Sequence, residues 1–299
     1  MRKRTAETTS QRRAESAART AGLPAADRRS ESGHIAVLDR ATALLAALAL
    51  SPTPATLNEA AKQAGLSKAT AFRILATMTE HGLVEQDEAT SSYRLGIAPL
   101  RLGMAVLDGI PMHRVARPVM RAVCDMLNET VVLSVRNGDL RVNIDAVECT
   151  NAIGSSRRIG EPRPLHVGPA SRVMLAAMSD AQIQAYLKRH QLTKNGSSHT
   201  AYRAALWKDV RRVRRTGLAS MDAEASPEAQ AIATAIRAPG GSAIAAIYVA
   251  IPRGRFSRRV EARCGQALRR AAGQIEKALA AAELEAGRTG RTRRGGRQM

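Results

Sequence analysis

The sequence predicts an α+β protein in which a small N-terminal winged helix-turn-helix is joined by a linker helix to a larger C-terminal α+β domain. Three observations support this. Two short helical segments meet at Gly65 and lead into strand-like residues after Gly82. Asn137-Gly138, the strongest short hairpin signal, lies between two β-branched runs. A long helical pattern over Ser257–Leu284 follows the last strands, and strands with helices before, between and after them indicate an α+β arrangement.

The first two helices of the small domain follow from apolar spacing and capping residues. Ile35–Leu50 is a leucine- and alanine-rich helical pattern. The next helix begins after Thr56, because Thr56 and Glu59 form a Thr-x-x-Glu capping box that satisfies amide donors at a helix start. It ends at Gly65, since glycine adopts the left-handed conformation of a helix end without steric cost. Ser67 then caps the third helix.

The helix after Ser67 has two different faces. One is an apolar stripe at helical spacing, and the other is small, polar and cationic. This combination is what a helix that reads the DNA major groove requires. The alternative is an ordinary amphipathic helix pair. The stripe consists of Ala71, Ile74, Leu75 and Met78, and the opposite face of Lys68, Ala69, Thr70, Phe72 and Arg73.

The next segment favours the DNA-reading interpretation. Leu83–Gln86 is strand-like, a polar turn follows, and Tyr93–Leu95 returns as a second strand, which together form the wing of a winged helix. We predict that Arg94 on this wing contacts the minor groove or the DNA backbone.

Residue chemistry predicts the contacts of the reading helix. Lys68 and Arg73 are either solvated surface cations or, as we expect, contacts to phosphate or guanine. Thr70 is expected at a thymine methyl group or a phosphate, and Phe72 either contacts a thymine methyl group or packs against the preceding helix. The predicted DNA-binding residues are Ser67, Lys68, Ala69, Thr70, Phe72, Arg73 and Arg94.

The chain changes character after the wing. Ile97–Leu107 is a predicted linker helix, and Met112–Glu129 is an amphipathic helix that Pro118 interrupts or kinks. The apolar face of that helix is predicted to hold Val115, Val119, Val123 and Met126. The remaining predicted strands are 130–135, 140–147, one near 152–159, 218–222, 231–238 and 243–251, and the remaining helices are 170–178, 181–190, 202–216 and 257–284.

Composition excludes several classes of protein. A length of 299 residues suggests about two domains at roughly 150 residues each. No apolar run reaches the roughly 20 residues that cross a bilayer, and the N-terminus lacks an apolar signal core. We therefore expect a cytoplasmic protein without a membrane partner. Three cysteines without a C-x-x-C pair disfavour disulfides and structural zinc, and we expect no cofactor, no metal and no catalytic residues.

The net charge of +20 is unevenly distributed. Residues 34–101 hold six Lys/Arg and six Asp/Glu, so the predicted DNA-reading module is neutral. Part of the excess lies in the terminal segments 1–33 and 286–299, which are interpreted as disordered basic tails that add non-specific, salt-sensitive phosphate attraction.

The motifs along residues 35–285 resemble the IclR family of bacterial transcription regulators. GLSKATAFRILATMTEHGLVEQDEATSSYRLG is similar to that family's reading helix, wing and Tyr-x-Leu-Gly exit, here Tyr93, Leu95 and Gly96. VARPVMRAVCDMLNETVVLSVRNGD resembles the start of its effector domain, and Gly160 with Pro164-Leu165-His166 resembles the approach to its sensor helix. The resemblance implies a GAF-like effector domain, a double-stranded DNA operator, homodimers or dimers of dimers, and control by a small metabolite.

The resemblance also implies an effector site, and this chain departs from the family pattern there. It lacks the family's cysteine and proline around Glu228–Ala235, and Tyr248 and Ala250 replace small hydroxyl residues. These changes favour a ring-bearing or apolar organic acid over a compact carboxylate, and a pocket that has lost its ligand is equally consistent. An anionic effector could meet Arg157, Arg158 or Arg163, and His166 is either a core histidine or a pocket residue. The implied effector-binding residues are His166, Gly168, Asp222, Ala231, Tyr248 and Ala250.

Three functional hypotheses remain. The first is a ligand-responsive transcription regulator whose dimer spans half-sites about one helical turn apart. The second is a sequence-indifferent architectural DNA-binding protein with a vestigial sensor. The third, an enzyme with a regulatory head, lacks motifs such as G-x-S-x-G, H-E-x-x-H and a phosphate loop. The predicted segments are a basic tail 1–33, a winged helix-turn-helix 34–96, a linker 97–111, an effector and oligomerisation domain 112–285, and a basic tail 286–299.

Overall fold

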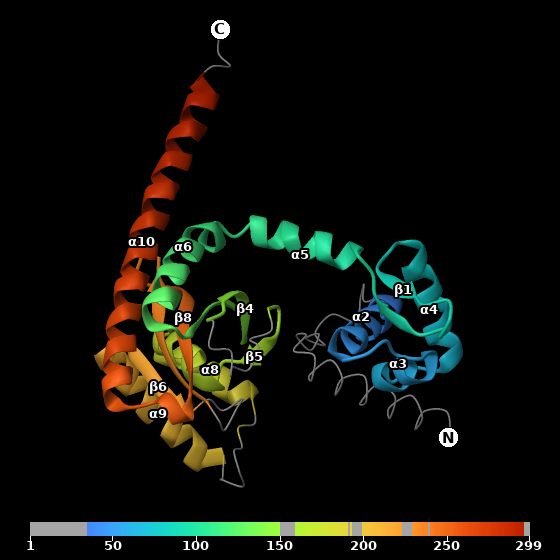
Figure 1. The fold of residues 1–299 in the computed structure, drawn as a ribbon, viewed down its shortest axis with the longest axis horizontal. Helices are drawn as coiled ribbons and strands as arrows, with labels where there is room; N and C mark the ends of the chain where they lie inside the picture. Colours follow the sequence, from blue (N-terminus) through green and yellow to red (C-terminus); the bar gives the residue numbers. More distant parts are fainter. Residues whose placement is uncertain are drawn as a thin grey trace. The chain divides into compact units, whose positions relative to one another are not determined.

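The structure is a computed structural model that describes residues 35–149, 159–190, 192, 199–222, 229–238 and 240–295, with the backbone alone at residues 199 and 222 and beyond residue 282. The chain divides between Gly109 and Ile110 into two compact units, and Figure 1 labels many of their elements. The predicted strand near 152–159 and the tail 1–33 lie outside the described residues, apart from a turn that begins at Ile159.

The N-terminal unit is a winged helix-turn-helix, as the sequence predicts. Its helices enclose one apolar core, to which α2 contributes Leu44 and Leu48, α4 contributes Leu75, and the wing contributes Val84 and Tyr93. The elements are α2 (Ala36–Leu50), α3 (Leu57–Ala64), α4 (Lys68–Glu80), β1 (Val84–Gln86), β2 (Tyr93–Leu95) and α5 (Ala98–Asp108).

The predicted capping interactions position α3 and α4. The Thr56 hydroxyl accepts from the Glu59 amide at 3.3 Å and the Glu59 carboxylate accepts from the Thr56 amide at 2.8 Å, which completes the capping box. Gly65 ends α3 in the left-handed region at φ 69°. The Ser67 hydroxyl accepts from the Thr70 amide and caps α4. These local interactions set the turn between the two helices.

A close backbone approach anchors the wing to the end of α4. A Cβ atom at Gly96 would lie 2.3 Å from the Gly82 carbonyl oxygen, so only glycine fits there. The Gly96 amide donates to Leu83 O at 3.0 Å. On the other side, Tyr93 exchanges two backbone hydrogen bonds with Ala55, just before α3. Backbone hydrogen bonds therefore hold the two ends of the wing together and join its second strand to the segment before α3.

The C-terminal unit is built on a six-stranded antiparallel sheet in the order β5-β4-β3-β8-β7-β6. The strands are β3 (Thr130–Asn137), β4 (Leu140–Val147), β5 (Pro162–Pro164), β6 (Leu218–Asp222), β7 (Ala229–Arg237) and β8 (Ala243–Pro252). The helices are α6 (Pro111–Leu127), α7 (Gly168–Ala176), α8 (Asp180–Arg189), α9 (His199–Thr216) and α10 (Arg258–Gly295), and a 3-10 turn spans Arg253–Arg255.

Helices cover both faces of this sheet. Alternate strand residues such as Ala231, Ala233 and Tyr248 share a core with α7, α8 and α9. Side chains alternate across a strand, and on the other face Leu218 lies against Gly265 of α10. Helices α6 and α10 pack together and against the sheet, and both can be followed in Figure 1.

Helix α6 differs from the prediction in two respects. It continues through Pro118 without the interruption that was one of the two expected effects, and a kink there stays a prediction. Pro118 removes the donor to the Arg114 carbonyl, but both residues are exposed, so water can satisfy that carbonyl. The predicted apolar face is displaced by about one position. Met126 is exposed, and the buried residues are Met112, Ala116, Met120, Val123 and Cys124.

Helix α10 is longer than predicted. It runs to Gly295 instead of ending at Leu284, and so extends into the segment 286–299 that was interpreted as a tail. The residues around position 284 are Ala, Glu and Leu, which are strong helix formers. No capping or breaking residue stops the helix there, and the Ser257 hydroxyl caps its start by accepting from the Val260 amide at 3.2 Å.

We predict that Thr56→Ala destabilises the N-terminal unit by about 1 kcal/mol, the usual effect of removing a Thr cap. Hydrogen exchange of the α3 amides should accelerate in the variant. The control is Thr77→Ala, because the exposed Thr77 hydroxyl bonds only within its own helix, to Arg73 O. Equal protection of α3 in both variants would show that the capping box does not hold the helix.

Candidate functional site

Helix α4 buries one side and leaves the other open. Ala71 and Leu75 are fully buried and Met78 is 5% exposed, so the predicted apolar stripe is confirmed, with Ile74 packed at its edge. Lys68, Ala69, Phe72 and Arg73 on the opposite face are exposed, and Thr70 is half-buried. Buried neighbours therefore fix the orientation of the cationic face.

The start of α4 is suited to an anion. Ser67 Oγ and Thr70 Oγ1 lie 2.9 Å apart, so the cap holds both hydroxyls in place. No acidic residue lies in the first turn, and a helix N-terminus carries partial positive charge that favours phosphate. Lys68 adds a full positive charge at the same end.

The exposure of Phe72 favours one of the two roles that the sequence left open. Its side chain is 53% exposed, so it does not pack into the domain core against α3. A large apolar side chain among cations on an open face is suited to contact the methyl group of a thymine.

The wing cation is held by a neighbour. Arg94 lies opposite Glu85 in the β1–β2 register, and its Nη2 is 2.9 Å from the Glu85 carboxylate. The Arg94 side chain is 64% exposed, and exposed ion pairs contribute little stability. A DNA phosphate could therefore replace Glu85 as the partner of Arg94 at little cost.

The structure brings most of the implied effector residues together. Asp222 pairs with Gln230, next to Ala231, and Ala231 pairs with Ala250 across β7 and β8. Tyr248 follows two positions away on the same face of β8. Gly168, with φ +79°, begins α7, which packs on β6, β7 and β8.

His166 lies two residues before Gly168, and its imidazole has its own aromatic neighbours. Tyr186 OH lies 2.7 Å from His166 Nδ1 and accepts from the His166 amide at 3.2 Å, so its own proton can go to Nδ1. Burial, with smaller effects from His190 and Arg172, lowers the pKa of His166 to about 4. Tyr202 packs edge-on against the imidazole. These contacts give the half-buried His166 hydrogen-bond partners within the fold, and its implied role in effector binding stays a prediction.

A buried polar cluster in the same layer was missed by sequence reasoning. Arg141 is 8% exposed, and its guanidinium lies 5.6 Å from the Tyr248 ring centroid. It donates to Asn143 Oδ1 at 2.6 Å, to Ser134 Oγ at 3.1 Å and to Ser171 Oγ at 3.2 Å. Tyr248 OH also donates to Asn143 Oδ1, at 3.3 Å. The available signal was polar residues at buried positions of two hydrophobic strands beside the Asn137-Gly138 turn.

The other cations proposed for the pocket are placed differently. Arg163 lies 2.7 Å from Glu161 in an ion pair, and Arg157 and Arg158 lie outside the described residues. Arg172 is buried and lies 3.5 Å from Asp209. Arg141, which the sequence did not single out, lies over the Tyr248 ring.

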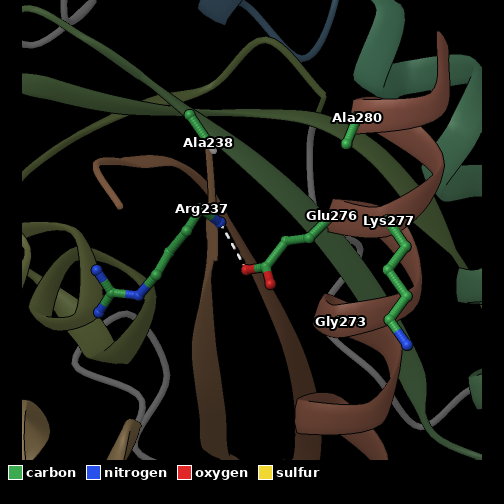
Figure 2. Close-up of a pocket in the computed structure, with 6 residues that line it drawn as sticks. All are labelled: Arg237, Ala238, Gly273, Glu276, Lys277 and Ala280. Atoms are coloured by element: carbon green, nitrogen blue, oxygen red, sulfur yellow. Dashed lines mark hydrogen bonds between the residues drawn. The ribbon is translucent and has the colours of Figure 1, made fainter. Parts of the chain in front are cut away.

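A separate cavity of about 310 Å³ lies between the end of β7 and α10. Figure 2 shows the Glu276 carboxylate turned toward the Arg237 amide, which donates to it at 2.7 Å, while the Arg237 and Lys277 side chains point away. The carboxylate thus satisfies a strand-end amide. None of the implied effector residues lines this cavity, whose walls are Arg237, Ala238, Gly273, Glu276, Lys277 and Ala280.

We predict that His166 makes the C-terminal unit less stable as the pH falls from about 6.5 toward about 4. In that window the unfolded chain binds a proton that the folded imidazole does not, so stability is lost on acidification, at most about 1.4 kcal/mol per pH unit. His166→Gln should reduce this slope.

Trp207, the chain's single tryptophan, packs against the same core, so its fluorescence during denaturation reports this unit. His190, Asp139, Arg172 and Asp209 lie in the neighbouring network and are retained in all variants. His81→Gln, at an exposed position, is the control. Identical slopes for wild type and His166→Gln would contradict the assignment.

Comparison with known proteins identifies the two units. The IclR helix-turn-helix domain matches residues 37–88, and the C-terminal domain of bacterial transcriptional regulators of the IclR type matches residues 104–277. The regulator BhcR of Paracoccus denitrificans is 29% identical over 239 residues, which are 80% of this chain and 84% of that protein. The transcriptional repressor IclR of Escherichia coli is 27% identical over 236 residues, 78% of this chain and 86% of that protein.

A solved structure shows the same fold. The IclR homolog of Microbacterium hydrocarbonoxydans, crystallised with 4-hydroxybenzoate, aligns with a TM-score of 0.68 at 24% identity and covers 82% of this chain and 99% of that one. The chain therefore belongs to the IclR family of bacterial transcriptional regulators, with a helix-turn-helix domain and a C-terminal ligand-binding domain.

Proposed function

We propose that this protein regulates transcription by reading an operator with α4 and that an organic acid bound in the C-terminal unit modulates this binding. The observation that carries the proposal is the exposed cationic face of α4, with Lys68 and Arg73 held outward by the buried stripe. Family membership supports regulation over the architectural alternative. We place this function in the cytoplasm, where bacterial DNA lies.

We propose that separate segments bind DNA, link the domains and bind the effector, with the boundaries that the sequence predicts. Residues 34–96 bind DNA, 97–111 link, and 112–285 bind the effector and oligomerise. The linker helix α5 supports a homodimer, because it has no buried residue. A partner copy would remove its apolar surface from water, which comprises Leu100, Leu102, Met104 and Val106.

The effector is proposed to be an acid whose carboxylate is recognised near Arg141 and Tyr248. A guanidinium forms strong, charge-assisted hydrogen bonds with carboxylates, and its burial strengthens electrostatic attraction. Tyr248 contributes an aromatic face and a hydroxyl, which suit a ring-bearing acid. Ala231 and Ala250, which have small side chains, pair across the adjacent strands β7 and β8.

We predict that Arg73→Ala weakens operator binding by about 1–3 kcal/mol, the usual value of one good base contact, and leaves the melting temperature nearly unchanged because the side chain is exposed. Fluorescence anisotropy on operator and random duplexes measures both affinities. The matched control is Arg101→Ala, an exposed arginine of α5. An equal loss on random DNA would mean that Arg73 only contacts the backbone.

The effector proposal predicts that benzoate-type acids such as 4-hydroxybenzoate stabilise the C-terminal unit and that the corresponding amides do not. A ligand at 100 times its dissociation constant adds about 2.7 kcal/mol of stability, which Trp207 fluorescence would report. Arg141→Gln should abolish the acid-induced shift, measured against that variant's own ligand-free melting temperature. A shift that persists in Arg141→Gln would place the carboxylate elsewhere.

A further inference from the structure

The described part of α10 carries a continuous stripe of basic residues on its solvent side. Arg259, Arg263, Arg270 and Lys277 are all exposed, and their spacings of four, seven and seven residues place them on one helix face. Over the 18 residues from Arg259 to Lys277 the helix rises about 27 Å, which is the length of about eight base pairs of duplex.

The stripe is not compensated by acidic side chains. Residues 258–282 hold six Lys/Arg and two Asp/Glu. One of the two acids, Glu276, already accepts a hydrogen bond from the backbone amide of Arg237. Within the described ranges Arg259, Arg270 and Lys277 form no ion pair with a carboxylate. Arg263 donates to the Met126 carbonyl, which leaves its charge unneutralised.

We propose that this stripe is a second DNA-contacting surface, which binds the phosphate backbone of duplex DNA without reading sequence. The inference rests on the proposed function in one respect. A duplex bound by α4 is already tethered to the chain, so the stripe meets DNA at a high effective concentration. It goes beyond that function because it assigns backbone affinity to the C-terminal unit.

Charge chemistry selects this partner over others. A second copy docked through the same stripe would bring like charges together, which disfavours self-association there. A membrane surface would require apolar side chains beside the cations. In the described chain α10 contributes no exposed large hydrophobic residue, and Met126 of α6 is a single apolar side chain next to Arg263, too little for insertion into a membrane. A row of cations with small and polar neighbours, such as Gln266 and Gln274, is suited to a row of phosphates.

The distribution of charge gives the stripe a physical role. The winged helix-turn-helix is neutral over residues 34–101, so its own long-range attraction for DNA is weak. Non-specific affinity depends on the number of phosphates that cations neutralise. A basic stripe on the other unit supplies this attraction without altering the reading face.

The test removes three stripe cations from the full-length protein. Arg259→Gln, Arg270→Gln and Lys277→Gln are combined, and binding to a random duplex of about 30 base pairs is measured from about 50 to about 200 mM salt. The slope of log K against log salt concentration is negative, and each lost phosphate contact reduces its magnitude by about 0.9. The triple variant should therefore reduce the magnitude of the slope by about 2.7.

The matched control removes the same charge from the α8–α9 side of the sheet. Lys188→Gln, Lys208→Gln and Arg211→Gln, all at exposed positions, are combined and should leave the slope at the wild-type value. Both basic termini are present in every variant, so their contribution cancels. Trp207 fluorescence confirms that each variant is folded.

Each outcome is decisive. A slope whose magnitude is reduced only in the α10 variant supports the stripe as a DNA surface. Equal slopes in the α10 variant and wild type, or equal losses in both triple variants, overturn it. Failure of the proposed function gives a different result, because wild type would then show no preference for any recovered operator while the α10 effect on random duplex would persist.

Discussion

The burial of one side of α4 is the constraint on which the functional assignment depends. The apolar side of α4 packs into the core that α2, α3 and the wing enclose, and the residues buried there are Ala71, Leu75 and Met78. Rotating α4 to hide its cations would expose two large apolar side chains, and burying each of these is worth roughly 1.5–3 kcal/mol. The two ends of α4 are fixed as well. Ser67 caps its N-terminus, and the close approach of Gly96 to Gly82 fixes where the wing leaves its C-terminus.

Local features of the fold could be predicted from sequence because their causes are local. The capping box at Thr56, the left-handed Gly65 and the Asn137-Gly138 turn depend on neighbours a few residues away. The apolar face of α6 could not be assigned as well, because several rotations of a helix rich in Ala, Val and Met are hydrophobic, and α10 and the sheet choose among them. Arg141 was missed for a related reason. Its partners Ser134, Asn143, Ser171 and Tyr248 come from three strands and a helix, and only the tertiary fold brings them together.

The two units divide recognition into separable parts. The neutral winged helix-turn-helix presents few cations in fixed orientations, which favours selectivity over bulk attraction. The C-terminal unit holds a buried polar cluster beside Tyr248 on one side of its sheet and the basic stripe of α10 on the other. His166, implied by family resemblance as a ligand contact, is hydrogen-bonded to Tyr186 and Tyr202, and a role for it in effector binding stays a prediction.

Protection of guanine N7 from dimethyl sulfate on a recovered operator tests the central claim most directly. Guanine N7 lies in the major groove, so a reading helix that presents Arg73 should protect guanines in two half-sites about one helical turn apart. In Arg73→Ala at least one protected guanine in each half-site should become reactive while the others stay protected. An operator that is fully bound with every guanine N7 reactive would contradict the account, because α4 would then not lie in the major groove.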